Sequence, residues 1–127
     1  MKKIFADKAP KAIGPYSAAI QSGNLIFCSG QTPLNPDTMV IEGATASEQT
    51  NLVLNNLESV LKAAGADRSH VLKTSVFLKN FADFEKMNKA YEAFFGDHKP
   101  ARTTVEVSRL PKDAMVEIDC VAELTKS

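Results

Sequence analysis

The sequence predicts an α+β fold in which two helices cover one face of a mixed sheet of about six strands. Short apolar runs of strand length recur along the chain, and two longer stretches place their apolar residues at helical intervals. The resulting order is strand, strand, strand, helix, strand, helix, strand, strand, which corresponds to a two-layer domain. With 127 residues, of which 44% are hydrophobic, the chain can build one core, and we expect a single domain over residues 1–127.

The strands are predicted from apolar runs bounded by turn residues. Residues 17–22 and 25–29 form two such runs separated by Gly23-Asn24, a glycine-containing pair used in tight hairpins. The remaining strands are expected at an edge segment and at three apolar runs, residues 3–5, 71–78, 103–107 and 115–122.

Two helices are predicted from capping residues and helical periodicity. Thr45 and Glu48 have the spacing of a capping box at the start of a helix over residues 46–64. Asn80 is expected to cap the second helix, which stops at Gly96. The apolar stripes are Val53, Leu57, Val60, Leu61 and Ala64 in the first helix, and Phe84, Met87, Tyr91 and Phe94 in the second.

Both faces of the predicted sheet carry apolar residues. Under period-two alternation, LIFCS (25–29) and VEIDCVA (116–122) place apolar side chains on either side of their strands. Two helices can cover only one face, so the other face is expected to pack against another subunit. The alternative is that an antiparallel sheet leaves this face in contact with water.

Composition argues against several classes of protein. Lysine plus arginine equals aspartate plus glutamate at 15 each, so nothing attracts the chain to nucleic acid. The N-terminus lacks the apolar segment of a signal peptide, and no stretch of 18 apolar residues occurs, so a cytoplasmic protein without a membrane partner is expected.

Few residues have the spacing of a metal or cofactor site. His70 and His98 are isolated, and no nucleotide-binding or serine hydrolase motif occurs, so neither a metal nor a cofactor is expected. Cys28 and Cys120 lie within strand-like runs and not in a CxxC motif. We expect buried free thiols; the alternative is a disulfide or redox pair.

Arg102 is the most informative polar residue. It follows a proline in PARTTVEV, residues 100–107, at the start of a β-type run. A guanidinium stays protonated, and its planar fork fits a carboxylate with two hydrogen bonds, so a small organic acid is a suitable ligand. The alternative is an arginine that forms a structural ion pair at the start of a strand.

Four further segments accompany PARTTVEV in a set order. They are GPYS (14–17), CSGQTP (28–33), MNKAYEAFF (87–95) and RLPKDAMVEIDCVA (109–122). Together the five segments resemble the Rid family, also called YjgF/YER057c/UK114, over residues 4–124, and most closely its reactive intermediate deaminase A branch. The resemblance implies a chorismate-mutase-like fold and a homotrimer closed around the sheet faces. It also implies active sites between subunits and the hydrolysis of 2-imino acids.

The resemblance assigns two catalytic roles. Arg102 would hold the substrate carboxylate, and Glu117 would position and activate water. The strand pattern alone places Glu117 on the same face as Asp119, which is equally compatible with a solvated glutamate. The family's other substrate-binding positions fall on Tyr16, Ser29, Gly30, Asn88 and Thr104.

These substrate-binding positions have plainer explanations as well. Tyr16 can anchor a turn after Gly-Pro, Ser29 can end a strand, and Asn88 can bind backbone at a helix boundary. Asn88 nevertheless lies on nearly the same side of its helix as Tyr91, where a polar amide needs a partner. Many family members have cysteine where this chain has Thr104, which excludes a thiol nucleophile there but leaves the backbone carbonyl able to hold water.

The expected activity is the cofactor-free hydrolysis of short 2-imino acids to 2-keto acids and ammonia, a form of metabolite damage control. A protonated imine is already electrophilic, so general acid and base help is adequate. The main alternative is a protein that binds or senses 2-keto acids without converting them. A nuclease is disfavoured by the zero net charge, and a chaperone-like role would require apolar surface that assembly hides.

Overall fold

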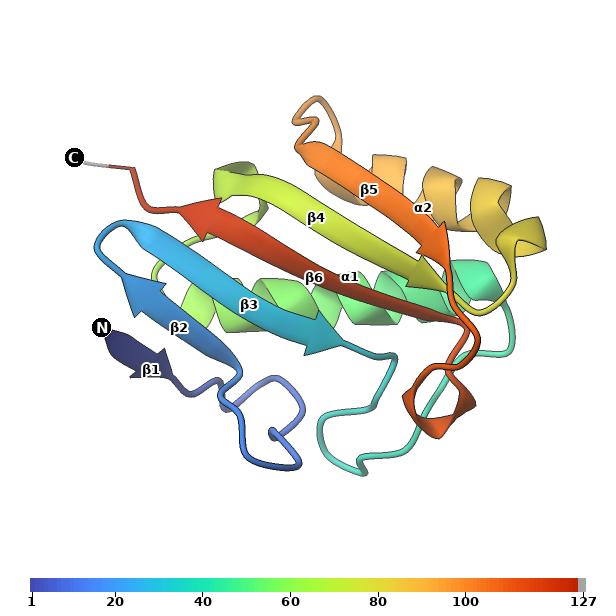
Figure 1. Cartoon of the computed structure of the whole chain (residues 1–127), viewed down its shortest axis with the longest axis horizontal. Helices are drawn as coiled ribbons and strands as arrows, with labels where there is room; N and C mark the ends of the chain where they lie inside the picture. The colour runs from blue at the N-terminus through green and yellow to red at the C-terminus, as the bar shows by residue number, and fades with distance from the viewer. Residues whose placement is uncertain (126–127) are drawn as a thin grey trace.

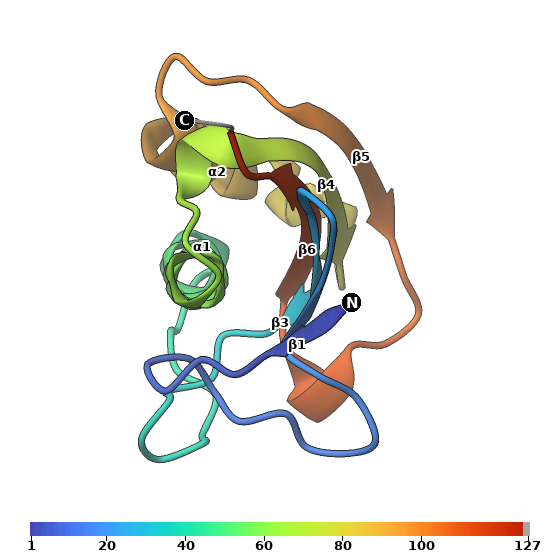
Figure 2. The ribbon, with the colours of Figure 1, turned by 90° about the vertical axis from the view of Figure 1, so that its left-hand side faces the viewer.

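The structure, a computed structural model, describes residues 1–125. Its centre is a six-stranded sheet of order β1-β2-β3-β6-β4-β5 (Figure 1). The strands are β1 (Lys2–Ile4), β2 (Ala19–Ser22), β3 (Leu25–Gln31), β4 (Val71–Leu78), β5 (Ala101–Glu106) and β6 (Val116–Glu123). The helices α1 (Ala46–Ala63) and α2 (Phe84–Phe95) lie on one side of the sheet, as the edge-on view shows (Figure 2). The predicted two-layer α+β domain is confirmed, and the last two residues of its predicted range, 126 and 127, lie outside the described residues.

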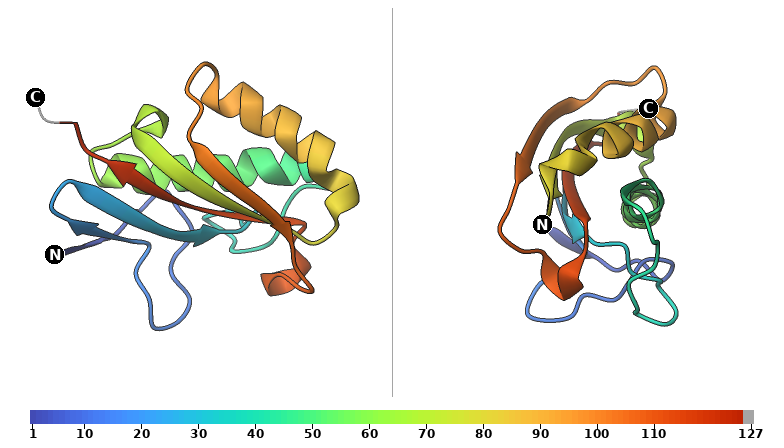
Figure 3. Two further views of the ribbon diagram at one scale, coloured as in Figure 1. Left: turned by 45° about the horizontal axis from the view of Figure 1, so that its top comes forward. Right: turned by 90° about the vertical axis from the view of Figure 1, so that its right-hand side faces the viewer.

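The connection through α2 makes the sheet mixed. Four strand pairs are antiparallel, whereas β4 and β5 are parallel and are joined by α2 as a crossover. Two parallel strands require such a connection, and Figure 3 shows α2 running beside them. As a result, Arg102, the second residue of β5, lies next to the body of α2.

The core lies between the sheet and the helices. Along β6, Val116, Ile118 and Cys120 are buried while Glu117 and Asp119 are only partly covered, which confirms the predicted alternation. Helix α1 begins as predicted, because the Thr45 hydroxyl accepts a hydrogen bond from the Glu48 N–H. Its core residues are Val53, Leu54, Leu57, Val60 and Leu61.

Several details differ from the sequence prediction. Strand β5 begins two residues earlier than expected, so that Arg102 lies within it, and β3 extends two residues further, to Gln31. Asn80 does not cap α2: its side chain accepts from the Ala82 N–H and caps a short 3₁₀ turn, Phe81–Asp83, that precedes the helix. Near the end of α2, Phe95 is buried, whereas Phe94 is only partly buried. Strand β2 begins two residues later than expected, because the Ser17 and Ala18 carbonyls bind Ser29 outside the regular ladder.

Strand β3 contains a β-bulge opposite β6. Cys28 pairs with Cys120 and Gln31 pairs with Ile118, so Ser29 and Gly30 together lie opposite a single residue of β6. An extra residue breaks the alternation, so that Cys28 and Gln31 are both buried although they are three positions apart. The bulge therefore turns Ser29 and Gly30 together away from the helices. Both cysteines are free and buried, as predicted.

The face of the sheet opposite the helices is open and partly apolar. Strand pairing places Phe27 beside Val121 and Phe77 beside Val105 on this face, and Phe27 and Val105 are 45% and 40% exposed. We call this surface the open face; its apolar members are Ile20, Phe27, Phe77, Val105 and Val121. Neither helix in residues 1–125 has the length and apolar character needed to cross a membrane.

Candidate active site

Arg102 is held by residues of α2. Its Nη1 donates a 2.7 Å hydrogen bond to the Asn88 side-chain oxygen, and its guanidinium carbon lies 4.8 Å from the centre of the Tyr91 ring. The Tyr91 hydroxyl is itself hydrogen-bonded to Thr74 of β4 at 2.7 Å, which fixes the ring that faces the arginine. Sequence reasoning found the Arg102 and Asn88 positions but treated Tyr91 only as a core residue.

Arg102 forms no ion pair within residues 1–125, although Glu92 lines the same cavity. The ion pairs of this part of the chain involve other residues, and the one hydrogen bond that the guanidinium donates goes to a neutral amide. The predicted alternative, a structural ion pair, is therefore not what the structure shows. Arg102 is half-buried and lines a cavity of about 410 Å³ beside α2. A partly desolvated guanidinium without an acidic partner is suited to bind an anion.

Thr104 lies two residues beyond Arg102 on β5 and therefore on the same face of that strand. Like Arg102, it is partly buried. We call Asn88, Tyr91, Arg102 and Thr104 the arginine half-site.

Glu117 lies in a different cavity, of about 500 Å³. The lining comprises Ile13, Tyr16, Ser29, Gly30, Thr32, Leu34, Pro111, Lys112 and Glu117. Burial raises the pKa of the Glu117 carboxyl, and the negative charge of the neighbouring Asp119 raises it further. A carboxyl group shifted in this direction is better matched to proton transfer near neutral pH than an exposed glutamate.

Three other predicted site residues gather around Glu117. We call Tyr16, Ser29, Gly30 and Glu117 the glutamate half-site. The Ser29 hydroxyl donates to the Ser17 carbonyl at 2.7 Å, and the Tyr16 hydroxyl accepts from the Ile13 N–H at 3.3 Å. The first bond ties the segment before β2 to the bulge of β3, and the second forms a turn within that segment. Lys112, which sequence reasoning missed, forms part of the wall and donates to the Met39 carbonyl at 3.2 Å.

The two half-sites of one chain do not face each other. Arg102 pairs with Thr74, whose side chain contacts α2, so Arg102 points to the helix side of the sheet. Glu117 pairs with Phe77 and points to the open face. The Cα atoms of Arg102 and Glu117 are two strand spacings apart across the sheet and three residues apart along the strands, which corresponds to roughly 14 Å. One chain therefore does not bring the proposed catalytic pair together.

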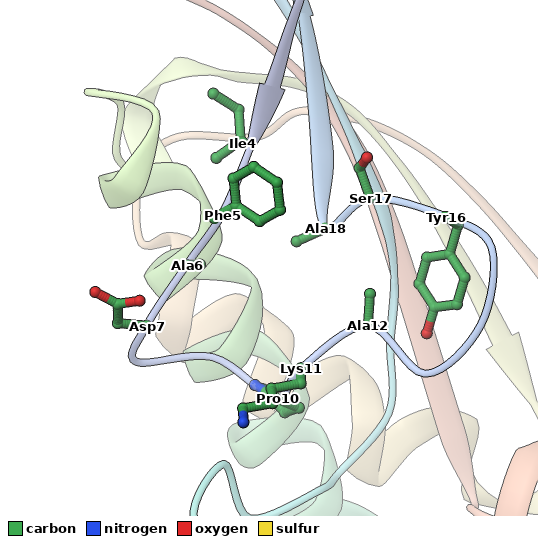
Figure 4. Close-up of a pocket in the computed structure, with 10 residues that line it drawn as sticks. All are labelled: Ile4, Phe5, Ala6, Asp7, Pro10, Lys11, Ala12, Tyr16, Ser17 and Ala18. Carbon is green, nitrogen blue, oxygen red and sulfur yellow. The ribbon is translucent and has the colours of Figure 1, made fainter.

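A further cavity of about 430 Å³ lies beside the N-terminal segment. Figure 4 shows its lining, which runs from Ile4 at the end of β1 to Ala18 before β2. It shares Tyr16 with the glutamate half-site but contains neither Arg102 nor Glu117. Its charged members, Asp7 and Lys11, are both exposed or partly exposed side chains of a loop, so we assign it no chemistry.

Comparison with known proteins identifies the family. Residues 6–124 match the family described as endoribonuclease L-PSP. The chain belongs to this family, also known as the Rid or YjgF family. It is 50% identical over 119 residues to a RutC family protein of Pyrococcus abyssi, with 94% of each chain covered. It is 44% identical over 124 residues to the 2-iminobutanoate/2-iminopropanoate deaminase of Escherichia coli, covering 95% of this chain and 96% of that protein.

Solved structures of Rid proteins share the fold over the full length. The structure of Escherichia coli TdcF with bound serine superposes with a TM-score of 0.94 at 38% identity, covering 98% of this chain and all of that one. The bound serine of that relative is a small molecule with a carboxylate. The family is thus described as an endoribonuclease, whereas one of these relatives is named a deaminase.

Proposed function

We propose that this protein hydrolyses short 2-imino acids to 2-keto acids and ammonia, in sites shared between neighbouring subunits of a homotrimer. The observation that supports it most directly is the half-buried Arg102, which forms no ion pair within residues 1–125 and which Asn88 and Tyr91 hold in place. The deaminase names of two relatives are consistent with this activity. A cytoplasmic location remains the expectation from sequence.

Arg102 would bind the substrate carboxylate with its unoccupied donors. The Nη1 bond to Asn88 and the Tyr91 ring restrict rotation of the guanidinium, so the carboxylate would be received in one orientation. The imine carbon is bonded directly to the carboxylate carbon, and fixing one therefore fixes the other. Such orientation replaces a random encounter with water by a directed one.

Glu117 would act as both base and acid. As an ionised carboxylate it would take a proton from the attacking water while the new C–O bond forms and the C=N π electrons move to nitrogen. The carbinolamine that results would receive the proton back on nitrogen. The C–N bond would then break to release ammonia while the hydroxyl oxygen forms the C=O bond and passes its proton to the Glu117 carboxylate, from which ammonia or solvent removes it. The 2-keto acid would remain on Arg102. No electrons are exchanged with a cofactor at any step.

A neighbouring subunit is needed to complete this site, because Arg102 and Glu117 of one chain lie on opposite faces of the sheet. The open face offers a surface for that neighbour: Phe27 and Val105 are large exposed apolar residues in its centre and at its edge. Burial of such a surface favours association. We therefore propose that the arginine half-site of one subunit meets the glutamate half-site of the next.

The activity can be tested with imines made in place. A pyridoxal phosphate dehydratase acting on serine or threonine generates 2-iminopropanoate or 2-iminobutanoate, and ammonia and 2-keto acid are followed over time. We expect the protein to raise the rate of imine decay about a hundred- to ten-thousandfold over water. Tight binding of 2-ketobutyrate without any acceleration would instead support a binding or sensing protein.

The shared site predicts recovery of activity in mixed trimers. Trimers made only of Arg102→Ala subunits or only of Glu117→Gln subunits should be inactive. In a mixed trimer, however, one of the three interfaces joins a native Arg102 from one subunit to a native Glu117 from the next. Random mixing of equal amounts should therefore restore about a quarter of the wild-type activity. Co-expression with two different affinity tags isolates the mixed trimers. Mixed trimers as inactive as the parents would show that the two residues do not act across one interface.

An RNA-cleaving activity, which the family description mentions, finds less support in this chain. Its formal net charge is zero, and RNA binding depends mainly on cationic side chains that neutralise phosphates. The cavity at Arg102 adds one lysine, Lys99, and one acidic residue, Glu92, and this small set of charges matches a single carboxylate better than a strand of phosphates.

A further inference from the structure

We propose that Gly30 is a positioning residue, whose missing side chain leaves the space in which the Glu117 carboxylate lies against the bulge of β3. In this view Gly30 acts through Glu117 and does not need to contact the substrate. The inference rests on the proposed function where it concerns turnover, but the placement of Glu117 can be tested independently.

The Glu117 side chain occupies the volume that a side chain at position 30 would need. An ideal Cβ built on Gly30 would lie 2.5 Å from Glu117 Oε2, 3.0 Å from its Cδ and 3.2 Å from its Cγ. These separations are shorter than van der Waals contact, so a methyl group at position 30 and the present carboxylate position exclude each other. Glu117 would have to move, since Gly30 belongs to the sheet backbone.

Backbone conformation does not explain the glycine at this position. The other five of the six glycines have positive φ values, which L side chains adopt only with strain. Gly30 has no such φ, so alanine would fit its backbone. Space for the neighbouring carboxylate is therefore the physical reason for glycine here. A glycine inside a strand commonly marks a bulge or a close approach of another group, and Gly30 combines both.

The surroundings of Glu117 show why its exact placement matters. On its own strand Asp119 shares its face, and from the connection before β6 Lys112 lines the same cavity. The opposing strands present Phe77 of β4 and the bulge of β3, which carry no charge next to it. Contact with the bare backbone at Gly30 covers one side of the carboxyl group and contributes to the burial that raises its pKa.

Replacing Gly30 by alanine tests the proposal through kinetics. We expect kcat to fall about ten- to a hundredfold, because the base is displaced, while KM changes less than about threefold, because Arg102 still binds the carboxylate. Gly23→Ala is the matched control: nothing lies within 4 Å of its Cβ, but its φ is +59°. This control should lose thermal stability and keep its kcat.

A shorter acid provides the decisive comparison. Aspartate at position 117 withdraws the carboxyl group by one methylene. Adding Gly30→Ala to Glu117→Asp should therefore lower kcat less than about threefold. An equal loss in both backgrounds, or a kcat unaffected by Gly30→Ala alone, would refute the positioning role.

A titration separates this inference from the proposed function. The pKa of Glu117, followed by carbon-13 NMR of its carboxyl group, should move down toward that of an ordinary glutamate in Gly30→Ala. This result would support the positioning role even if the wild-type protein hydrolysed no imine, which would overturn the proposed function alone. A Glu117 pKa that is the same in wild type and variant would overturn the positioning role whatever the activity.

Discussion

Replacing Arg102 by alanine is expected to lower kcat/KM for 2-iminobutanoate by about a hundred- to a thousandfold. The substitution removes the group proposed to bind the acid and leaves Asn88 and Tyr91 without the guanidinium they orient. Because orientation of the imine depends on the same contact, kcat should fall as well as KM rise. Steady-state rates with the dehydratase-generated imine measure both quantities.

Two comparisons make this result specific to the carboxylate. Arg102→Lys keeps the charge but loses the planar fork, so its activity should lie between those of wild type and Arg102→Ala. Arg109→Ala removes an exposed arginine outside both half-sites and should behave as wild type. Ethylguanidine added to Arg102→Ala should restore part of the rate. Wild-type kinetics in a folded, assembled Arg102→Ala protein would rule out the carboxylate clamp.

Replacing Glu117 by glutamine is expected to lower kcat by about a hundred- to ten-thousandfold with little change in substrate binding. The amide keeps the shape of the side chain but cannot accept the proton of water. In the wild type, kcat/KM should decline at acid pH along the titration of Glu117, at a pH above the range of an exposed glutamate, since burial and Asp119 raise its pKa. Asp119→Asn should shift this acid limb to lower pH. An acid limb that persists unchanged in Glu117→Gln would assign it to another group.

Glu117→Gln should stabilise the folded protein at neutral pH although it lowers activity. The pKa of Glu117 is higher in the folded protein than in the unfolded chain, so its contribution to stability is complete below the unfolded pKa and is lost as pH rises through the folded pKa. Glutamine stays neutral throughout. The melting temperature of Glu117→Gln relative to wild type should therefore increase between acid and neutral pH.

Much of this fold follows from local sequence rules. The alternation in VEIDCVA correctly separated Ile118 and Cys120 from Glu117, and Gly23 marked the hairpin between β2 and β3. The resemblance to known motifs then pointed to Arg102 and Glu117, which composition alone would not have distinguished from surface charges. The predicted polar partner for Asn88 is confirmed as Arg102.

Other features could not be predicted because they depend on contacts distant in sequence. The two residues of the β3 bulge oppose one residue of β6, and this register depends on contacts between residues 87 to 92 positions apart, Gln31 with Ile118 and Cys28 with Cys120. Strand β5 has too few apolar residues to show which face holds Arg102, so its orientation toward α2 emerged only from the parallel pairing with β4. The role of Tyr91 beside Arg102 was hidden by its place in an ordinary apolar stripe.

The parallel crossover has a consequence for how such proteins can diversify. One continuous segment, from β4 through α2 to β5, contains every member of the arginine half-site, whereas the glutamate half-site draws on the N-terminal segment, β3 and β6. In the proposed mechanism, the residues that bind the carboxylate and the residues that act on the C=N bond are thus encoded on separate stretches of polypeptide. Substitutions in the β4–α2–β5 segment can therefore change which acids bind, and substitutions around Glu117 can abolish turnover, without altering the geometry of the other half-site.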